Sequence, residues 1–263
     1  MRLRKNLCEL INLVARPLGF ELFMAGQTME DNTWVDQVRL AGTEASTIFD
    51  VGGNLGQSVK QYRQLFPRAK IHTFEPFIES YTELKKVCDR CGHANAHHTA
   101  ITDQSGVSRL NVNVLSGTNS LLEFSPKAGE TDIHSTMATL TSTEVATTTL
   151  DLFCEKHGIN SIDILKMDVQ GSELKVLHGA ASLLERQAIR LIYAEVMFDE
   201  MYVGQADFCE IRSYLASKDY FLYGLYYLKQ NRGSMLGWGD AIFVSNAIRS
   251  EVLTHPEQHH LAN

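Results

Sequence analysis

The 263-residue chain lacks three features that would assign it quickly to a class of protein. It has no apolar run of 18 or more residues, so we expect no transmembrane helix. Its five cysteines are an odd number without the spacing of a disulfide framework, which predicts reduced thiols and a cytoplasmic location. It is also short of positive charge, and the net charge of −7 argues against nonspecific nucleic-acid binding.

The usual patterns of a metal site are missing as well. Cys88 and Cys91 form one C-x-x-C pair with His93 close by, but no second pair follows. Two residues three apart on a helix simply share a face, so the pair alone does not indicate zinc. The acids show no diagnostic spacing for a divalent cation either. The sequence therefore predicts no metal.

A glycine-rich turn at residues 50–56, Asp-Val-Gly-Gly-Asn-Leu-Gly, organises the rest of the chain. Residues 47–49 before it predict a buried strand, and a helix is expected from Gln57 onward. At such a turn, doubly wound α/β folds hold a nucleotide-like cofactor against unpaired helix N–H groups. A dinucleotide site requires the spacing G-x-G-x-x-G, but Asn54 and Gln57 occupy two of those glycine positions, which disfavours NAD.

The apolar periodicity predicts strands and helices alternating around this turn. Further strands are expected at 69–74, 95–101, 162–167, 189–196, 220–227 and 241–244. Helices are expected at 31–42, 79–91, 150–157 and 211–218, and one more carries Leu174, Leu177 and Leu184. Residues 107–115 and 145–149 predict an antiparallel hairpin. The Ser- and Thr-rich stretch 116–149 then predicts a mobile flap near the site.

Together these elements predict an α/β fold with a Rossmann-like doubly wound sheet. The sheet is expected to be mostly parallel with an antiparallel C-terminal strand, and to have helices on both faces. We expect a helical extension over 1–46, the main domain over 47–245 and a polar tail over 246–263. We expect residues 2–16 to form a basic amphipathic helix that packs on the main domain or on a homodimer partner, with a membrane-surface helix as the alternative.

Acidic residues stand at or near the ends of the expected strands. Glu75 ends the second strand, where an acid can accept hydrogen bonds from both hydroxyls of a ribose. Asp168, Glu195 and Asp240 stand near the ends of later strands. These three are the candidates for taking a proton from an acceptor molecule.

Several segments, taken in order, resemble the FkbM family of S-adenosylmethionine (SAM)-dependent methyltransferases. They are residues 50–56, Phe74-Glu75-Pro76, Ile-Leu-Lys-Met-Asp-Val-Gln-Gly-Ser-Glu-Leu at 164–174 and Leu-His-Gly-Ala at 177–180. The third is the most specific, although Gln170 stands where many relatives carry glutamate. The resemblance covers roughly 47–245 and implies O-methylation of a hydroxyl on a sugar, polysaccharide or natural product.

The expected cofactor is SAM, and its expected contacts lie in the glycine turn and at neighbouring strand ends: Asp50, Gly52, Gly53, Asn54, Gly56, Gln57, Glu75, Pro76, Phe77, Ala100, Ile101 and Asp168. The expected catalytic residues are Asp168, favoured as the proton acceptor, Glu195, which orients the acceptor, and Asp240. One alternative is a noncatalytic SAM- or nucleotide-binding regulatory module, which would need no acid cluster. The other is an NAD-dependent sugar-modifying enzyme.

Overall fold

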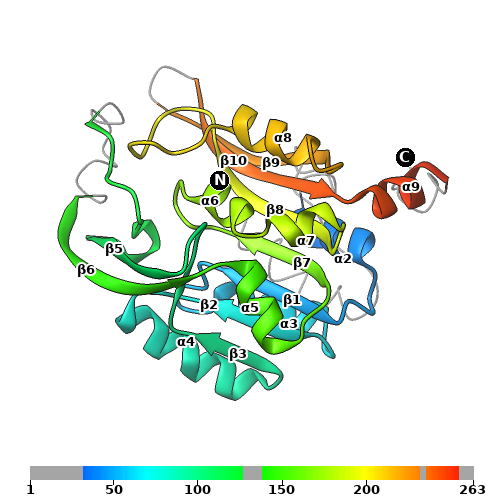
Figure 1. The fold of residues 1–263 in the computed structure, drawn as a ribbon, viewed down its shortest axis with the longest axis horizontal. Coiled ribbons are helices and arrows are strands. Elements are labelled where there is room, and N and C mark those ends of the chain that lie inside the picture. Colours follow the sequence, from blue (N-terminus) through cyan, green and yellow to red (C-terminus); the bar gives the residue numbers. More distant parts are fainter. Residues whose placement is uncertain (1–31, 127–137, 232–234, 255–263) are drawn as a thin grey trace, which may run out of the picture.

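A computed structural model of the chain describes residues 32–126, 138–231 and 235–254. Its main sheet has seven strands in the order β3-β2-β1-β7-β8-β10-β9 (Figure 1). They are β1 (Thr47–Val51), β2 (Lys70–Phe74), β3 (Ala94–His97), β7 (Ile162–Met167), β8 (Ile189–Met197), β9 (Phe221–Gln230) and β10 (Leu236–Val244). The pairs from β3 to β8 are parallel, and β10 runs antiparallel to both of its neighbours. This confirms the predicted doubly wound sheet.

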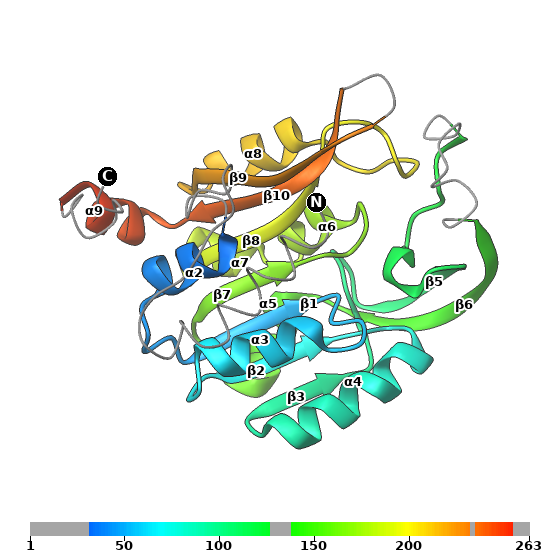
Figure 2. The same cartoon turned by 180° about the vertical axis from the view of Figure 1, so that it is seen from behind.

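Helices cover both faces of the main sheet, as predicted (Figures 1 and 2). One face carries α2 (Thr33–Ala41), α3 (Gln57–Leu65), α4 (Ile78–Cys91) and α9 (Asn246–Thr254). The other carries α5 (Leu150–His157), α6 (Glu173–His178), α7 (Ala181–Glu185) and α8 (Phe208–Ala216). Alternate strand residues point to opposite faces, so Ile48 joins one buried core and Phe49 the other.

A small second sheet lies beside the carboxyl ends of the main strands (Figure 1). It consists of β4 (Ala100–Ile101), β5 (Gly106–Asn113) and β6 (Thr139–Thr148), with β5 and β6 antiparallel. The predicted hairpin is therefore confirmed, although its return strand begins at Thr139 rather than at 145. The predicted mobility of residues 116–149 stays a prediction, and 127–137 lie outside the described residues.

The predicted third strand over 95–101 is wrong as a single strand. The chain leaves the main sheet after His97 and joins the small sheet at Ala100. Thr99 makes the change of direction, because its backbone N–H donates to His97 and its hydroxyl donates to the carbonyl of Ala146 in β6. The apolar periodicity of residues 95–101 fits one continuous strand, and it cannot show that the segment is divided between two sheets.

Two other boundaries differ from the predictions. The helix after β7 is divided into α6 and α7 near Gly179, where an added Cβ would lie 2.1 Å from the carbonyl oxygen of Thr102. The polar tail expected from Asn246 begins instead as α9, since Ile248 is fully buried in the core beside α2. The predicted helix over 2–16, the homodimer that depends on it and the histidines at 255, 259 and 260 lie outside the described residues.

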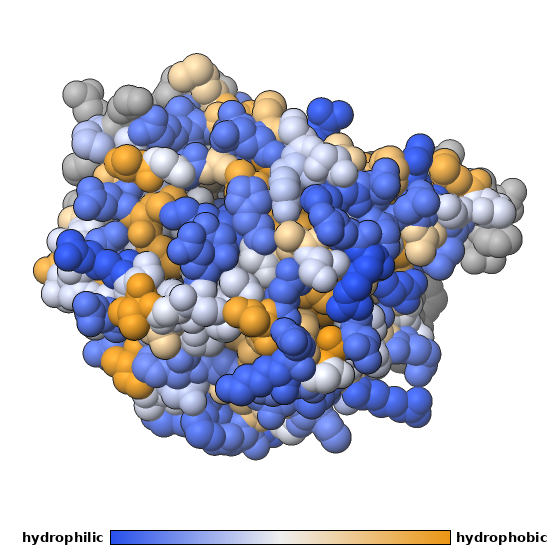
Figure 3. Space-filling model, viewed as in Figure 1, coloured by the Kyte–Doolittle hydropathy of each residue, from blue (hydrophilic) through white to orange (hydrophobic). Residues whose placement is uncertain are grey.

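Two features are absent from the described ranges: a membrane-spanning helix and a cluster of metal-binding side chains. No helix there is both long and apolar enough to cross a membrane. No group of three or more His, Cys, Asp and Glu side chains there is arranged to hold a metal ion, and Cys88 is buried in α4. The face of the molecule seen in Figure 3 carries its hydrophobic side chains as separate patches among hydrophilic ones, rather than as one continuous apolar area.

Candidate functional site

The register of the main sheet brings polar residues from four strands into one row at its carboxyl edge. Asp50 in β1 lies opposite Lys166 in β7, which lies opposite Tyr193 in β8. Glu195, two residues further along β8, lies opposite Asp240 in β10. Side chains two apart on a strand share a face, so the whole row faces the same side of the sheet. The strand order reverses between β1 and β7, which is where α/β folds bind ligands.

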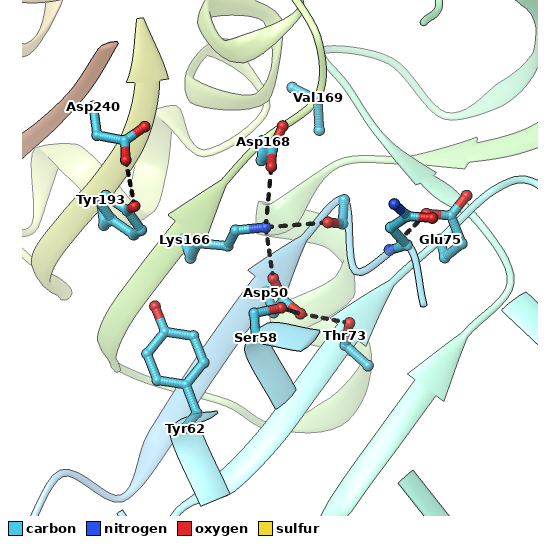
Figure 4. Close-up of polar contacts among 12 residues, drawn as sticks. Asp50, Ser58, Tyr62, Thr73, Glu75, Lys166, Asp168, Val169, Tyr193 and Asp240 are labelled. Atoms are coloured by element: carbon cyan, nitrogen blue, oxygen red, sulfur yellow. Dashed lines mark hydrogen bonds and ion pairs between the residues drawn. The ribbon is translucent and has the colours of Figure 1, made fainter. Parts of the chain in front are cut away.

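The ammonium group of Lys166 lies at the centre of this row (Figure 4). Its Nζ is 3.1 Å from Asp50 Oδ1 and 3.7 Å from Asp168 Oδ2, and it donates to the carbonyl oxygen of Gly52 at 3.1 Å. Burial lowers the pKa of Lys166, but the carboxylates of Asp50 and Asp168 together raise it above its ordinary value. The lysine therefore stays charged and ties the glycine turn to two strands.

Asp50 is turned into the protein rather than toward the cleft. It is fully buried, and its Oδ2 accepts hydrogen bonds from the hydroxyls of Ser58 at 2.7 Å and Thr73 at 3.0 Å. With Lys166 on the other oxygen, its carboxylate is occupied by the protein's own groups. We assign Asp50 to holding the turn in place, where the sequence predicts a cofactor contact.

The glycines of the turn are required by the protein's own packing. A Cβ on Gly52, whose φ is +83°, would lie 1.9 Å from the carbonyl oxygen of Asp168. A Cβ on Gly53 would lie 2.1 Å from Thr73 Oγ1. Gly56, with a φ of +82°, precedes α3 and packs closely against α4. Asn54 also has a positive φ, which asparagine tolerates better than most residues.

Glu75 links the turn to the next helix. Its Oε2 accepts a hydrogen bond from the backbone N–H of Asn54 at 2.9 Å, and its Oε1 accepts one from Phe77 at 2.8 Å. Phe77 is the residue before α4. Burial raises the pKa of Glu75 to about 7, although the two backbone hydrogen bonds lower it. The carboxyl group thus lies at the predicted end of the strand. Each of its two oxygens accepts one hydrogen bond from the backbone.

A small cavity of about 40 Å³ lies beside the turn, at the ends of β1 and β2. It is lined by Val51, Gly52, Phe74, Pro76, Thr99, Ala100, Ile101, Leu110, Leu121 and Val169. Gly52, Pro76, Ala100 and Ile101 are among the predicted cofactor contacts. Gln57 lies outside the lining, exposed at the first residue of α3. The lining is mostly apolar.

The three predicted acids lie close together: Asp168 and Glu195 form a pair, and Asp240 lies beside Glu195 on the next strand. Gln170 Nε2 donates to Asp168 Oδ1 and to Glu195 Oε2, both at 2.8 Å, so its amide bridges the two carboxylates. Asp240 accepts a hydrogen bond from the Tyr193 hydroxyl at 2.6 Å. Burial, followed by the charge of Asp168, raises the pKa of Glu195 well above its ordinary value. Burial also raises the pKa of Asp240.

Sequence reasoning gave no site role to several participants, among them Lys166 at the centre of the row. Tyr193 lies two residues before Glu195, so strand alternation alone would have placed it on the same face. Val169 directly follows Asp168 and lines the cavity. Gln170 was noted as a departure from relatives, but its bridging hydrogen bonds depend on the backbone turn after β7, and no local pattern indicates them.

The chain matches a known protein family over more than half of its length. Residues 50–222 match the family described as the methyltransferase FkbM domain. The 2-O-methyltransferase NoeI of Sinorhizobium fredii (strain NBRC 101917 / NGR234) is 27% identical over 164 residues, which cover 60% of this chain and 66% of that protein. The 31-O-demethyl-FK506 methyltransferase FkbM of Streptomyces tacrolimicus is 29% identical over 169 residues, with coverages of 57% and 64%. The chain therefore spans slightly less than two thirds of each relative.

A solved structure of magnesium protoporphyrin IX methyltransferase from Synechocystis PCC 6803 with bound SAM is 10% identical. It aligns with a TM-score of 0.44 over 81% of this chain and 76% of that one. The family match spans most of the chain and agrees with the resemblance found in its motifs. The protein belongs to the FkbM family of SAM-dependent methyltransferases.

Proposed function

We propose that the protein transfers the methyl group of SAM to a hydroxyl group on a sugar, a polysaccharide or a natural product. The observation that carries the proposal is the carboxylate pair of Asp168 and Glu195, which lies at the switch point of the sheet next to the glycine turn. The names of the two relatives, one of them a 2-O-methyltransferase, support a hydroxyl as the acceptor.

The residues at the turn fit the cofactor of the family. Pro76, Ala100 and Ile101, which line the small cavity, would contact the nucleoside ring, and Glu75 would hold the ribose. The backbone of Gly52 also lines that cavity, and Asp168 would face the amino acid end of the cofactor. When bound, SAM supplies an electrophilic methyl group on a sulfonium.

The chain's own contribution is orientation and one proton acceptor. Asp168 is the more open of the paired acids, with its side chain 43% exposed. We therefore assign it the role of the base that takes the proton from the acceptor hydroxyl. Glu195, held beside it by Gln170, would orient the hydroxyl. Orientation alone can supply about 7–11 kcal/mol of the barrier, and one general base about 10²–10⁴ in rate. Positioning is therefore expected to dominate.

Two measurements test the proposal. Titration calorimetry should show binding of SAM and S-adenosylhomocysteine and weak binding of NAD. A screen of hydroxylated acceptors with methyl-labelled SAM should then yield a labelled product. Tight NAD binding without SAM binding would contradict the cofactor. SAM binding with no product from any acceptor class would instead support a noncatalytic SAM-binding module.

A further inference from the structure

Gln170 uses all the polar atoms of its side chain within the candidate site. Its Nε2 donates to Asp168 Oδ1 and Glu195 Oε2 at 2.8 Å each, and its Oε1 accepts a hydrogen bond from the Tyr202 hydroxyl at 2.8 Å. Its backbone carbonyl accepts a hydrogen bond from the Ser120 hydroxyl at 2.7 Å. The backbone of Gln170 is left-handed, with a φ of +54°. This conformation is uncommon for glutamine, so it is maintained by the contacts around it.

The Tyr202 hydroxyl fixes the orientation of the Gln170 amide through its hydrogen bond to Oε1. Tyr202 is fully buried, and a Cβ on the neighbouring Gly171 would lie 3.1 Å from its ring. The amide nitrogen faces Asp168 and Glu195, which leaves its oxygen to accept the hydrogen bond from the Tyr202 hydroxyl.

We propose that Gln170 is the positioning residue of this site. Its amide holds the carboxyl groups of Asp168 and Glu195 side by side, favours their ionised forms, and leaves one oxygen of each for the methyl acceptor. This inference rests on the proposed function for the identity of that acceptor, but the effect of Gln170 on the two acids can be measured without any acceptor.

The physical reason is the environment of Glu195, which disfavours a charge. Burial and a second negative charge each disfavour ionisation, whereas hydrogen bonds from a neutral donor favour it. Lys166, 3.7 Å from Asp168, offsets only part of the repulsion. The charged and titratable groups that face the pair from the surrounding elements are Asp50, Lys166, Glu173, Tyr193, Tyr202 and Asp240. The charges of Glu173 and Asp240 also raise the pKa of Glu195, so the donor from Gln170 matters.

The test is a direct titration of the two carboxyl groups. Protein labelled with ¹³C in the Asp and Glu carboxyl carbons is titrated by NMR, and the signals are assigned with Asp168→Asn and Glu195→Gln. Gln170→Met removes both donors and keeps an unbranched side chain of similar length. We expect the apparent pKa values of the pair to rise by about one unit, since two hydrogen bonds to charged groups are lost. The acidic limb of the methyl-transfer pH profile should move by the same amount.

A second variant separates the donor from the space it fills. Gln170→Glu keeps an oxygen for the Tyr202 hydroxyl but places a third carboxyl group between the other two. The apparent pKa values should therefore rise further than in Gln170→Met. If Gln170→Met loses the circular dichroism spectrum of the wild type, the titration of Gln170→Glu decides the question.

The chain offers a matched control in Gln187. It also has a left-handed backbone, with a φ of +55°, and its amide is bonded at both ends, to the Lys218 carbonyl at 2.6 Å and the Asn246 N–H at 3.0 Å. It precedes β8, at the opposite edge of the sheet from Glu195. Gln187→Met should lower stability and leave the pKa values of Asp168 and Glu195 unchanged.

Unchanged carboxyl pKa values in a folded Gln170 variant, or an equal shift in Gln187→Met, would overturn the assignment. Failure of the proposed function would give a different experimental result. The wild type would then bind no SAM or transfer no methyl group, while the NMR titration would still report whether Gln170 governs the two acids.

Discussion

Two aspartates near the ends of neighbouring strands have opposite surroundings in this molecule. Asp50 is fully buried, paired with Lys166 and bonded to Ser58 and Thr73. Asp168 is 43% exposed at its side chain and shares the neutral amide of Gln170 with Glu195. The same residue type therefore holds the glycine turn in one place and faces the cleft in the other.

The difference shows how stability and chemistry are separated within a few ångströms. A buried carboxylate needs a charged partner, because removing that partner leaves an uncompensated charge away from water. A carboxylate that is open to the cleft keeps part of its hydration, so removing its charge affects stability little. The following changes are expected to sharpen or break this contrast, from the largest effect to the smallest.

Asp168→Asn should have the largest effect and should act on turnover. The amide keeps the shape of the side chain but cannot take a proton, so methyl transfer should fall by about 10²–10⁴. The unfolding free energy should change little. Single-turnover rates with labelled SAM, measured across a pH series, check this, with SAM affinity measured separately. A parent rate at every pH would remove Asp168 from its proposed role.

Lys166→Met should act on stability instead. It leaves the buried carboxylate of Asp50 without its cation, and breaking a buried pair in this way costs about 3–5 kcal/mol. Urea unfolding monitored by circular dichroism gives the value. The control is Lys218→Met, which breaks the solvent-exposed pair with Glu185 and should lower stability far less. Equal losses in the two variants would show that burial of the pair is unimportant.

Glu75 is an intermediate case, and its signature is a dependence on pH. Its pKa is raised from 4.5 to about 7, so the folded protein holds this proton more tightly than the unfolded chain does. Its contribution to the free energy of unfolding is therefore most favourable below about pH 4.5. That contribution declines by about 3 kcal/mol as the pH rises through 7.

Glu75→Gln cannot ionise and should lack that decline. Urea unfolding of both proteins at intervals from pH 4.5 to 8 measures it, and the variant should gain on the wild type as the pH rises. A difference between the two proteins that stays constant over this range would mean that Glu75 titrates as an ordinary surface acid.

Ser58→Ala should have the smallest effect of the four. It removes one hydrogen bond to the Asp50 carboxylate, worth about 1.5 kcal/mol, while Lys166 and Thr73 remain. The loss should appear in urea unfolding as a modest shift of the midpoint. A loss as large as that of Lys166→Met would mean that the hydroxyl, and not the cation, compensates the buried charge.

Much of the fold could be predicted because its signals are local. Apolar alternation and strand length marked β1, β2, β7 and β8, and the glycine turn marked the start of α3. Asp168 and Glu195 lie near the carboxyl ends of parallel strands, as predicted, because parallel strands bring those ends to one edge. Asp240 was expected at a strand end but lies within the antiparallel strand β10. The division of residues 95–101 between two sheets was not predictable, because it depends on which strand Thr99 meets.

The sequence by itself determined the family, the glycine turn, the strand-end acids and the alternation of the main sheet, all of which follow from residue type and spacing along the chain. Only the tertiary structure decided which acid is buried and which is open. Burial depends on what other segments place nearby: Lys166 is 116 positions after Asp50, and Tyr202 reaches Gln170 from the loop after β8. Those contacts set the local charge and dielectric, and therefore which carboxylate supports the fold and which one is free to accept a proton.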